Sequence, residues 1–183
     1  MKNRRSFLKK SAVGIACASF FPTAHLLAAS GLSTNTSIVK QPEDGETFLV
    51  RDKTPITFTI SKKKDNVERI SMCYEELLPG SNIPIHKHLN EDEYFYVTTG
   101  SGIFIIDETE FPAKPGTSVY VQKGTWHGFK NNGKEKVVFT FGYSPAGFED
   151  FFRQIGTPVG QIFRPKPADE FKELARKYGI VYR

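Results

Sequence analysis

The stretch Gly80-Ser-Asn-Ile-Pro-Ile-His86-Lys-His88-Leu-Asn-Glu-Asp-Glu93 is the part of this chain that decides its fold. After the first thirty residues, the only histidines are the two in this stretch and His127. Side chains two positions apart on a strand point to one face, so His86 and His88 would share an interior while Lys87 points away. Three imidazoles and one carboxylate predict a site for one divalent transition metal (Fe, Mn, Ni, Cu, Co or Zn) rather than for Ca or Mg.

Three neighbouring acidic residues compete for the role of the carboxylate ligand. Strand alternation favours Glu91 or Glu93 over Asp92, because only alternate side chains reach the interior. Glu93 also opens an apparent strand in which Phe95 and Val97 would line the same interior. The residues alone therefore predict His86, His88 and His127 as metal ligands, together with either Glu91 or Glu93.

The first 29 residues have the character of an export signal. Arg4-Arg5-Ser-Phe-Leu-Lys begins a basic segment, an apolar run follows over 12–21, and small residues follow at 28–30. The apolar run is too short to span a bilayer, and paired arginines in this context are typical of twin-arginine signals. We therefore expect an exported, periplasmic or extracellular protein with no stable membrane insertion after signal removal. A disordered basic tail or a lipoprotein signal ending before Cys17 are the alternatives.

Charge and cysteine content narrow the range of partners. The chain has a formal net charge of +5, but its first 29 residues carry five basic and no acidic residues, so the remainder is close to neutral. The sequence therefore gives no support for binding nucleic acid. Cys73 is the only cysteine after the signal, which excludes an intrachain disulfide there. This cysteine either faces the barrel or is buried and inert, and we expect the second.

The rest of the sequence predicts an all-β domain followed by a helical end. Short β-branched and aromatic runs separated by turn residues favour a sandwich or barrel. The expected strands are 47–50, 56–60, 70–77, 93–98, 103–106, 118–121 and 137–143, with a solvated hairpin tip at 62–64. Apolar residues with helical spacing follow 167, and a shorter helix is expected over 148–155. We assign 1–29 to the signal, 30–45 to a linker, 46–146 to the barrel and 147–183 to a C-terminal helical extension packed outside it.

Two motifs resemble those of the cupin superfamily. The first is Gly80, five residues, His86-x-His88, four residues, Glu93, six residues, Gly100. The second is Gly116, five residues, Gln122-x-Gly124, two residues, His127, three residues, Asn131, with Gln122 where cupins usually have proline. The resemblance implies a double-stranded β-helix, or jelly-roll barrel, and selects Glu93 as the carboxylate ligand. It also implies that two copies could pair through edge strands as a homodimer.

The stretches 91–97, 145–152 and 174–180 further resemble bacterial single-domain (type 2) cupins grouped with quercetin 2,3-dioxygenase. This resemblance implies a metal-dependent dioxygenase, an oxidoreductase acting on an aromatic or enol-type small molecule. It also implies a catalytic role for Glu93 in accepting the substrate's hydroxyl proton. The candidate walls of the substrate pocket are the aromatic residues of the predicted barrel, any one of which is more often core than contact: Phe95, Phe104, Trp126, Phe129, Phe139 and Phe141.

Two other functions remain open at this point. One is a non-enzymatic, metal-dependent protein that binds a sugar or small signal molecule, and the other is a decarboxylase or isomerase of a small anion. Arginine is the side chain best suited to grip small carboxylates, and the sequence has no arginine between Arg69 and Arg153. An uncharged or aromatic ligand is therefore expected.

Overall fold

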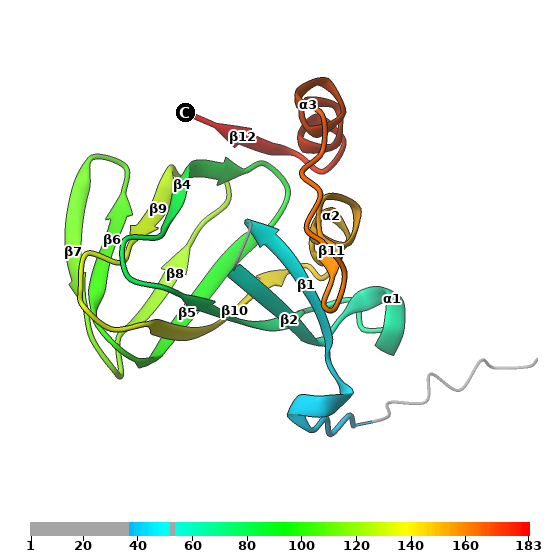
Figure 1. The fold of residues 1–183 in the computed structure, drawn as a ribbon, viewed down its shortest axis with the longest axis horizontal. Helices are drawn as coiled ribbons and strands as arrows, with labels where there is room; N and C mark the ends of the chain where they lie inside the picture. Colours follow the sequence, from blue (N-terminus) through cyan, green and yellow to red (C-terminus); the bar gives the residue numbers. More distant parts are fainter. Residues whose placement is uncertain (1–36, 52–53) are drawn as a thin grey trace, which may run out of the picture. The chain divides into compact units, whose positions relative to one another are not determined.

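The computed structural model describes residues 37–51 and 54–183, and the export signal expected over 1–29 lies outside them. Two antiparallel sheets make up most of the fold (Figure 1). The larger has the strand order β11-β1-β2-β3-β10-β5-β8, and the smaller has the order β12-β4-β9-β6-β7. This arrangement confirms the predicted all-β cupin architecture.

The strands of the larger sheet are β1 (Glu46–Arg51), β2 (Thr54–Ile60), β3 (Met72–Leu77), β5 (Asp92–Thr99), β8 (Ser118–Val121), β10 (Val137–Ser144) and β11 (Thr157–Pro158). Those of the smaller sheet are β4 (Asn82–His88), β6 (Gly102–Ile106), β7 (Thr109–Ala113), β9 (His127–Lys130) and β12 (Ile180–Tyr182). All seven expected strands are present. The two-residue β11, the mostly exposed β7 and the terminal β12 lack the alternating apolar run that would have indicated them.

Alternation along the strands builds the interior between the sheets. On β5, Glu93, Phe95 and Val97 are buried, while the side chains between them face outward. On β3, buried Cys73, Glu75 and Leu77 alternate in the same way. The interior is largely aromatic, with ring centroids 4.7 to 6.5 Å apart within the group Phe95, Phe104, Phe129, Phe139 and Phe141. Offset and edge-on aromatic contacts of this kind add to the stabilisation from apolar burial alone.

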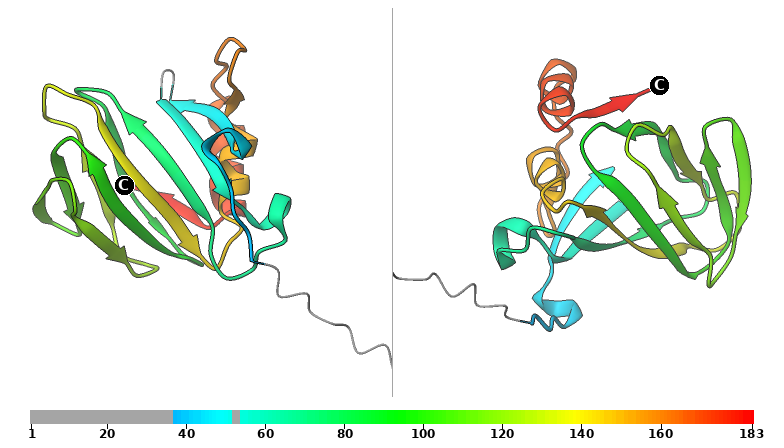
Figure 2. Two further views of the ribbon diagram at one scale, coloured as in Figure 1. Left: turned by 90° about the horizontal axis from the view of Figure 1, so that it is seen from below. Right: turned by 180° about the vertical axis from the view of Figure 1, so that it is seen from behind.

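The helices are short and lie at the β1 end of the larger sheet (Figures 1 and 2). They are α2 (Glu149–Ile155) and α3 (Ala168–Lys177), and a 3-10 turn, η1 (Pro42–Asp44), precedes β1. The predicted hairpin tip at 62–64 is an exposed connection between the antiparallel strands β2 and β3, and it forms one helical turn, α1 (Lys62–Asp65), ended by Asn66 in the left-handed conformation (φ 55°). The exposed connection was therefore predicted correctly, but its helical turn was not, because charge indicates exposure and not backbone conformation.

The C-terminal segment does not end as a helix. Gly179, with φ +69°, follows α3 in a conformation that other side chains rarely adopt, and it redirects the chain into β12. Strand β12 then pairs antiparallel with β4, so that Tyr182 lies opposite His86 and Ile180 opposite His88. The last residues of the chain are therefore next to the histidine-bearing strand. Among the described residues, no helix is long and apolar enough to cross a membrane.

Candidate metal centre

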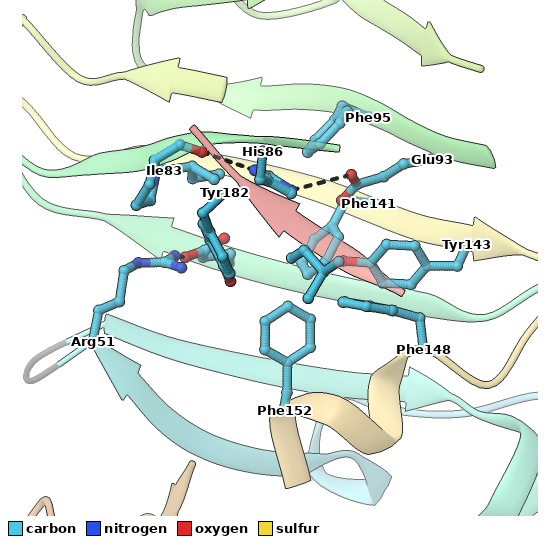
Figure 3. A pocket seen from close by; sticks show the side chains of 13 residues that line it. Arg51, Ile83, His86, Glu93, Phe95, Phe141, Tyr143, Phe148, Phe152 and Tyr182 are labelled. Atoms are coloured by element: carbon cyan, nitrogen blue, oxygen red, sulfur yellow. Dashed lines mark hydrogen bonds and ion pairs between the residues drawn. The ribbon is translucent and has the colours of Figure 1, made fainter. Parts of the chain in front are cut away.

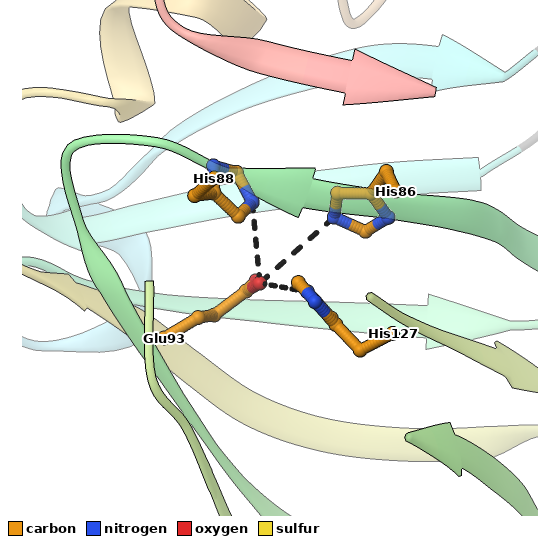
Figure 4. A group of neighbouring side chains, drawn as sticks. All are labelled: His86, His88, Glu93 and His127. Carbon is orange, nitrogen blue, oxygen red and sulfur yellow. Dashed lines mark hydrogen bonds and ion pairs between the residues drawn. The ribbon is translucent and has the colours of Figure 1, made fainter. Parts of the chain in front are cut away.

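Strands from both sheets bring the predicted ligands together. His86 and His88 lie on β4, and both are buried, while Lys87 points away and places its Nζ 4.5 Å from the centre of the Trp126 ring. His127 on β9 is the direct pairing partner of His86. Glu93 reaches the same point from β5 in the other sheet (Figure 4). Period-two geometry thus gives the side-chain directions that the sequence predicted.

The four donor atoms converge closely. Glu93 Oε2 lies 2.7 Å from His127 Nε2, 3.3 Å from His88 Nε2 and 3.9 Å from His86 Nε2. One ligand atom from each residue lies within 4.8 Å of every other, and no side chain of the set is more than 7% exposed. Of the three acidic candidates, Glu93 is the one directed at the histidines, whereas Asp92 bonds outward to the Tyr120 hydroxyl and the Lys123 amide.

Backbone carbonyls orient two of the imidazoles. His86 Nδ1 lies 2.8 Å from the Pro84 carbonyl oxygen, and His127 Nδ1 lies 3.0 Å from that of Thr125. Donation of Nδ1–H to these carbonyls leaves each Nε2 free to bind at the centre, as is usual for metal-ligating histidine.

His88 is oriented differently. Its Nδ1 faces the Glu91 carboxylate at 4.0 Å, and both atoms are buried without a hydrogen-bond partner among the residues described. Burial raises the pKa of Glu91 to about 7. Glu91 is therefore next to a ligand and is not itself directed at the centre.

The surroundings of the ligands shift their pKa values and so decide which of them carry a proton. Burial lowers the pKa of His86 to about 3, so this imidazole is neutral near pH 7. Burial alone would raise the pKa of Glu93, but the hydrogen bond with His127 and the His88 ring 3.3 Å away outweigh it and hold that pKa below its usual value. Burial alone would likewise lower the pKa of His127, yet the Glu93 carboxylate raises it. Without metal, His127 and Glu93 thus share a proton-mediated contact that a cation would replace.

The donor atoms of these four residues are of the kinds that bind a transition metal. His88 Nε2 is buried without a hydrogen-bond partner among the described residues, a costly arrangement unless a ligand satisfies it. Three imidazole nitrogens with one carboxylate oxygen are donors that suit such an ion, and they leave coordination positions open. The chain therefore has a buried metal-binding site made by His86, His88, Glu93 and His127 for one ion.

A cavity opens beside this centre (Figure 3). The empty space there is about 380 Å³, a figure that includes open solvent at the mouth, so the enclosed part is considerably smaller. Two of the expected aromatic walls, Phe95 and Phe141, line it. Phe104, Phe129 and Phe139 are instead core residues, and Trp126 contacts Lys87 away from the cavity lining. Cys73 is also buried in the core, and burial raises its pKa well above its usual value.

Several wall residues were missed in the sequence: Arg51, Glu75, Ile83, Pro84, Tyr143, Phe148, Phe152, Ile180 and Tyr182. Tyr143 shares the alternation of Phe139 and Phe141 on β10 and could have been found by it. Tyr182 and Ile180 could not have been found from the sequence, because no local pattern predicts the pairing of β12 with β4. The centroid of the Tyr182 ring lies 5.9 Å from that of His86.

Arg51 corrects the argument that the interior lacks arginine. It comes from the end of β1, outside the range of sequence considered, and lines the cavity in an ion pair with Glu75 of β3. Burial lowers the pKa of Arg51 to about 10, which leaves the guanidinium charged near neutral pH. The absence of arginine between 69 and 153 therefore does not exclude an arginine from the cavity.

Comparison with known proteins shows that the segment containing this site matches a protein-family model. A family model described as "Cupin domain" matches residues 73–143, which contain all four predicted ligands. The buried three-histidine, one-glutamate site thus lies entirely within the segment that matches the cupin model.

Individual relatives are more distant. An uncharacterised protein of Methanocaldococcus jannaschii is 31% identical over 78 residues, which are 42% of this chain and 62% of that protein. An oxalate-binding protein of Thermotoga maritima is 33% identical over 64 residues, or 35% of this chain and 53% of that protein. The match thus spans less than two thirds of either relative. The structure of KdgF from Halomonas sp. covers 63% of this chain and 99% of its own with a TM-score of 0.54, and its 15% identity shows shared fold alone.

Proposed function

We propose that this protein is an exported, metal-dependent dioxygenase acting on a small aromatic or enol-type molecule. The observation that carries the proposal is the position of the cavity: His86 and Glu93 form part of its wall, and aromatic side chains form much of the rest. A flat, weakly polar ligand would pack against Phe95, Phe141 and Phe148 while presenting an oxygen to the metal centre.

The chemistry divides between the ion and the side chains. A divalent metal, when held by the four ligands, supplies Lewis-acid activation of the substrate hydroxyl. Glu93 is ionised, since its pKa is lowered, and it can accept a proton only from a hydroxyl that has become strongly acidic. The aromatic walls exclude water and orient the ring, and Tyr143, whose pKa burial raises well above its usual value, remains a neutral hydroxyl that can donate a hydrogen bond.

Oxygen consumption tests this function. Protein loaded separately with Fe, Mn or Ni would be mixed with 3-hydroxy-4-pyrones or other enol-type aromatics in an oxygen electrode, and we expect turnover with at least one metal. A matched Glu93→Gln variant should lose it, whereas Glu110→Gln on the exposed β7 should not. Saturable ligand binding without oxygen uptake for any metal would instead indicate a non-enzymatic binding protein.

A second candidate is a cupin that binds or decarboxylates a small anion. The sequence similarity to an oxalate-binding protein favours it, although Arg51, the arginine that lines the cavity, is already paired with Glu75. Titration with oxalate, followed by assay for carbon dioxide, separates this candidate from the first. Release of carbon dioxide without oxygen uptake would favour the decarboxylase.

Export through the twin-arginine route is part of the proposal. That route carries folded proteins, so a site filled in the cytoplasm would retain its metal in a compartment where Cu and Zn compete strongly. Replacing the first 29 residues with a signal for unfolded export should then change the metal content of the purified protein. Identical metal content by both routes would contradict this part.

A further inference from the structure

The cavity has a second polar end, distinct from the metal ligands. Arg51 and Glu75 line it together with the metal-centre residues His86 and Glu93. Figure 3 shows Arg51 and Glu93 on opposite sides of the cavity, with Tyr182 between them. A molecule that reaches from one end to the other would therefore meet the metal centre with one group and the guanidinium with another.

The charges at this end cancel. The side chain of Glu75 is 3% exposed and that of Arg51 30% exposed, and the two form an ion pair. The buried Nε and Nη2 of this guanidinium lie beside a buried carboxylate, so the pair has no net charge to offer a ligand. It retains hydrogen-bonding capacity, because Arg51 Nε is buried and makes no hydrogen bond within the described part of the chain.

A ligand carboxylate should bind weakly next to the Arg51–Glu75 pair. It would lose its hydration and gain Arg51, but it would also meet the negative charge of Glu75 in a place of low polarity. A neutral group with a hydroxyl or carbonyl oxygen avoids that repulsion, because it can accept from Arg51 and donate to Glu75. Arginine alone would select anions, whereas arginine neutralised by glutamate rejects them.

We infer that the Arg51–Glu75 pair is a specificity element that selects ligands whose end remote from the metal is a neutral hydroxyl or carbonyl group and excludes those that carry a carboxylate there. The inference rests on the proposed function in that it uses the same cavity and a ligand anchored at the metal centre. It narrows the substrate class to neutral hydroxylated enol or phenol compounds, because the pair and the metal centre line the same cavity.

Two commercial probes isolate the effect. Kojic acid and comenic acid share the hydroxy-ketone that chelates metals and differ at the remote position, which carries a hydroxymethyl group in the first and a carboxylate in the second. Calorimetric titration of zinc-loaded protein measures both affinities without turnover, because zinc has no redox chemistry. We expect kojic acid to bind at least about tenfold more tightly than comenic acid.

Glu75→Gln keeps the shape of the side chain and removes its charge. The freed Arg51 should then favour comenic acid, which reverses the order of the two affinities. Glu76→Gln is the matched control, because Glu76 neighbours Glu75 on β3 but points outward to Lys136, and it should leave the wild-type order unchanged. If Glu75→Gln fails to fold, the double variant Arg51→Met with Glu75→Met replaces both charges by apolar groups and should bind the two probes more nearly alike than the wild type does.

The outcomes separate this inference from the proposed function. Wild-type preference for comenic acid, absence of binding by both probes, or an unchanged order in Glu75→Gln would each overturn it. A reversal in Glu75→Gln supports it even if oxygen is never consumed, in which case the dioxygenase proposal fails alone. If oxygen is consumed but Glu75→Gln leaves the order of the two affinities unchanged, the dioxygenase proposal stands and the specificity inference fails alone.

Discussion

The two ends of the cavity were built in different ways. The metal end takes three of its four ligands from one stretch of eight residues, 86–93, and the fourth from the nearby strand β9. The remote end is assembled from β1, β3 and the last strand of the chain, which supply Arg51, Glu75 and Tyr182. The first end is encoded locally, and the second depends on the way distant segments meet. Separate substitutions should therefore affect metal binding at one end and ligand selection at the other.

The largest expected effect is at the metal end. His88→Ala removes one of four ligands and should weaken metal affinity by more than about 100-fold, since changes to outer partners alone cost up to that much. The loss is measured by elemental analysis after dialysis and by chelator competition. Lys87→Ala, between the two histidines but directed to the other face, is the control and should retain the metal. Stoichiometric metal in His88→Ala would break the assignment of the centre.

Glu91 gives the next largest effect. Its carboxyl faces the unpartnered Nδ1 of His88 at 4.0 Å, so a small movement on metal binding would form the hydrogen bond that orients this ring. Glu91→Leu should reduce metal affinity by about 10- to 100-fold, whereas Glu91→Gln, which keeps a hydrogen-bond acceptor, should recover much of it. Equal affinities for all three proteins would show that Glu91 does not position His88.

Protons and the metal ion should compete for His127 and Glu93 at the metal end of the cavity. The pKa of His127 is raised by Glu93, so below that raised pKa the metal-free site holds a proton that the ion must displace. Metal affinity should therefore fall by at least about tenfold for each unit of decreasing pH below the pKa of His127, and become insensitive to this group above it. Calorimetry in buffers of different ionisation enthalpy measures the released proton. A flat affinity from pH 5 to 7 would contradict the proposed role of the pair.

The smallest effect is expected from Tyr182 at the remote end. Tyr182→Ala removes one cavity wall and should change the affinity for kojic acid by only a few-fold, since one aromatic contact is worth about 1 kcal/mol. Metal affinity should stay at the wild-type value, because Tyr182 contacts the ring of His86 without belonging to the ligand set. A loss of metal comparable to that in His88→Ala would show that the two ends are not separable.

Sequence patterns predicted the fold better than the cavity. The seven expected strands could be found because alternate burial leaves an apolar-polar rhythm in each, as in Glu93, Phe95 and Val97 on β5. The same rhythm could not separate wall from core, so Phe104, Phe129 and Phe139 were expected at the pocket although they pack inside. It also gave no sign of α1, where charge indicated only a solvated connection.

The sequence by itself determined the metal ligands, because the spacing of His86, His88 and Glu93 on extended segments fixes their direction within a few residues of chain. Only the tertiary structure decided what lies opposite them. Strand pairing brings β12 beside β4 and places Arg51 against Glu75, although β4 and β12 are separated by most of the domain. Such a pairing depends on which sheet edge the other strands leave free, and that cannot be read from a local pattern of residues.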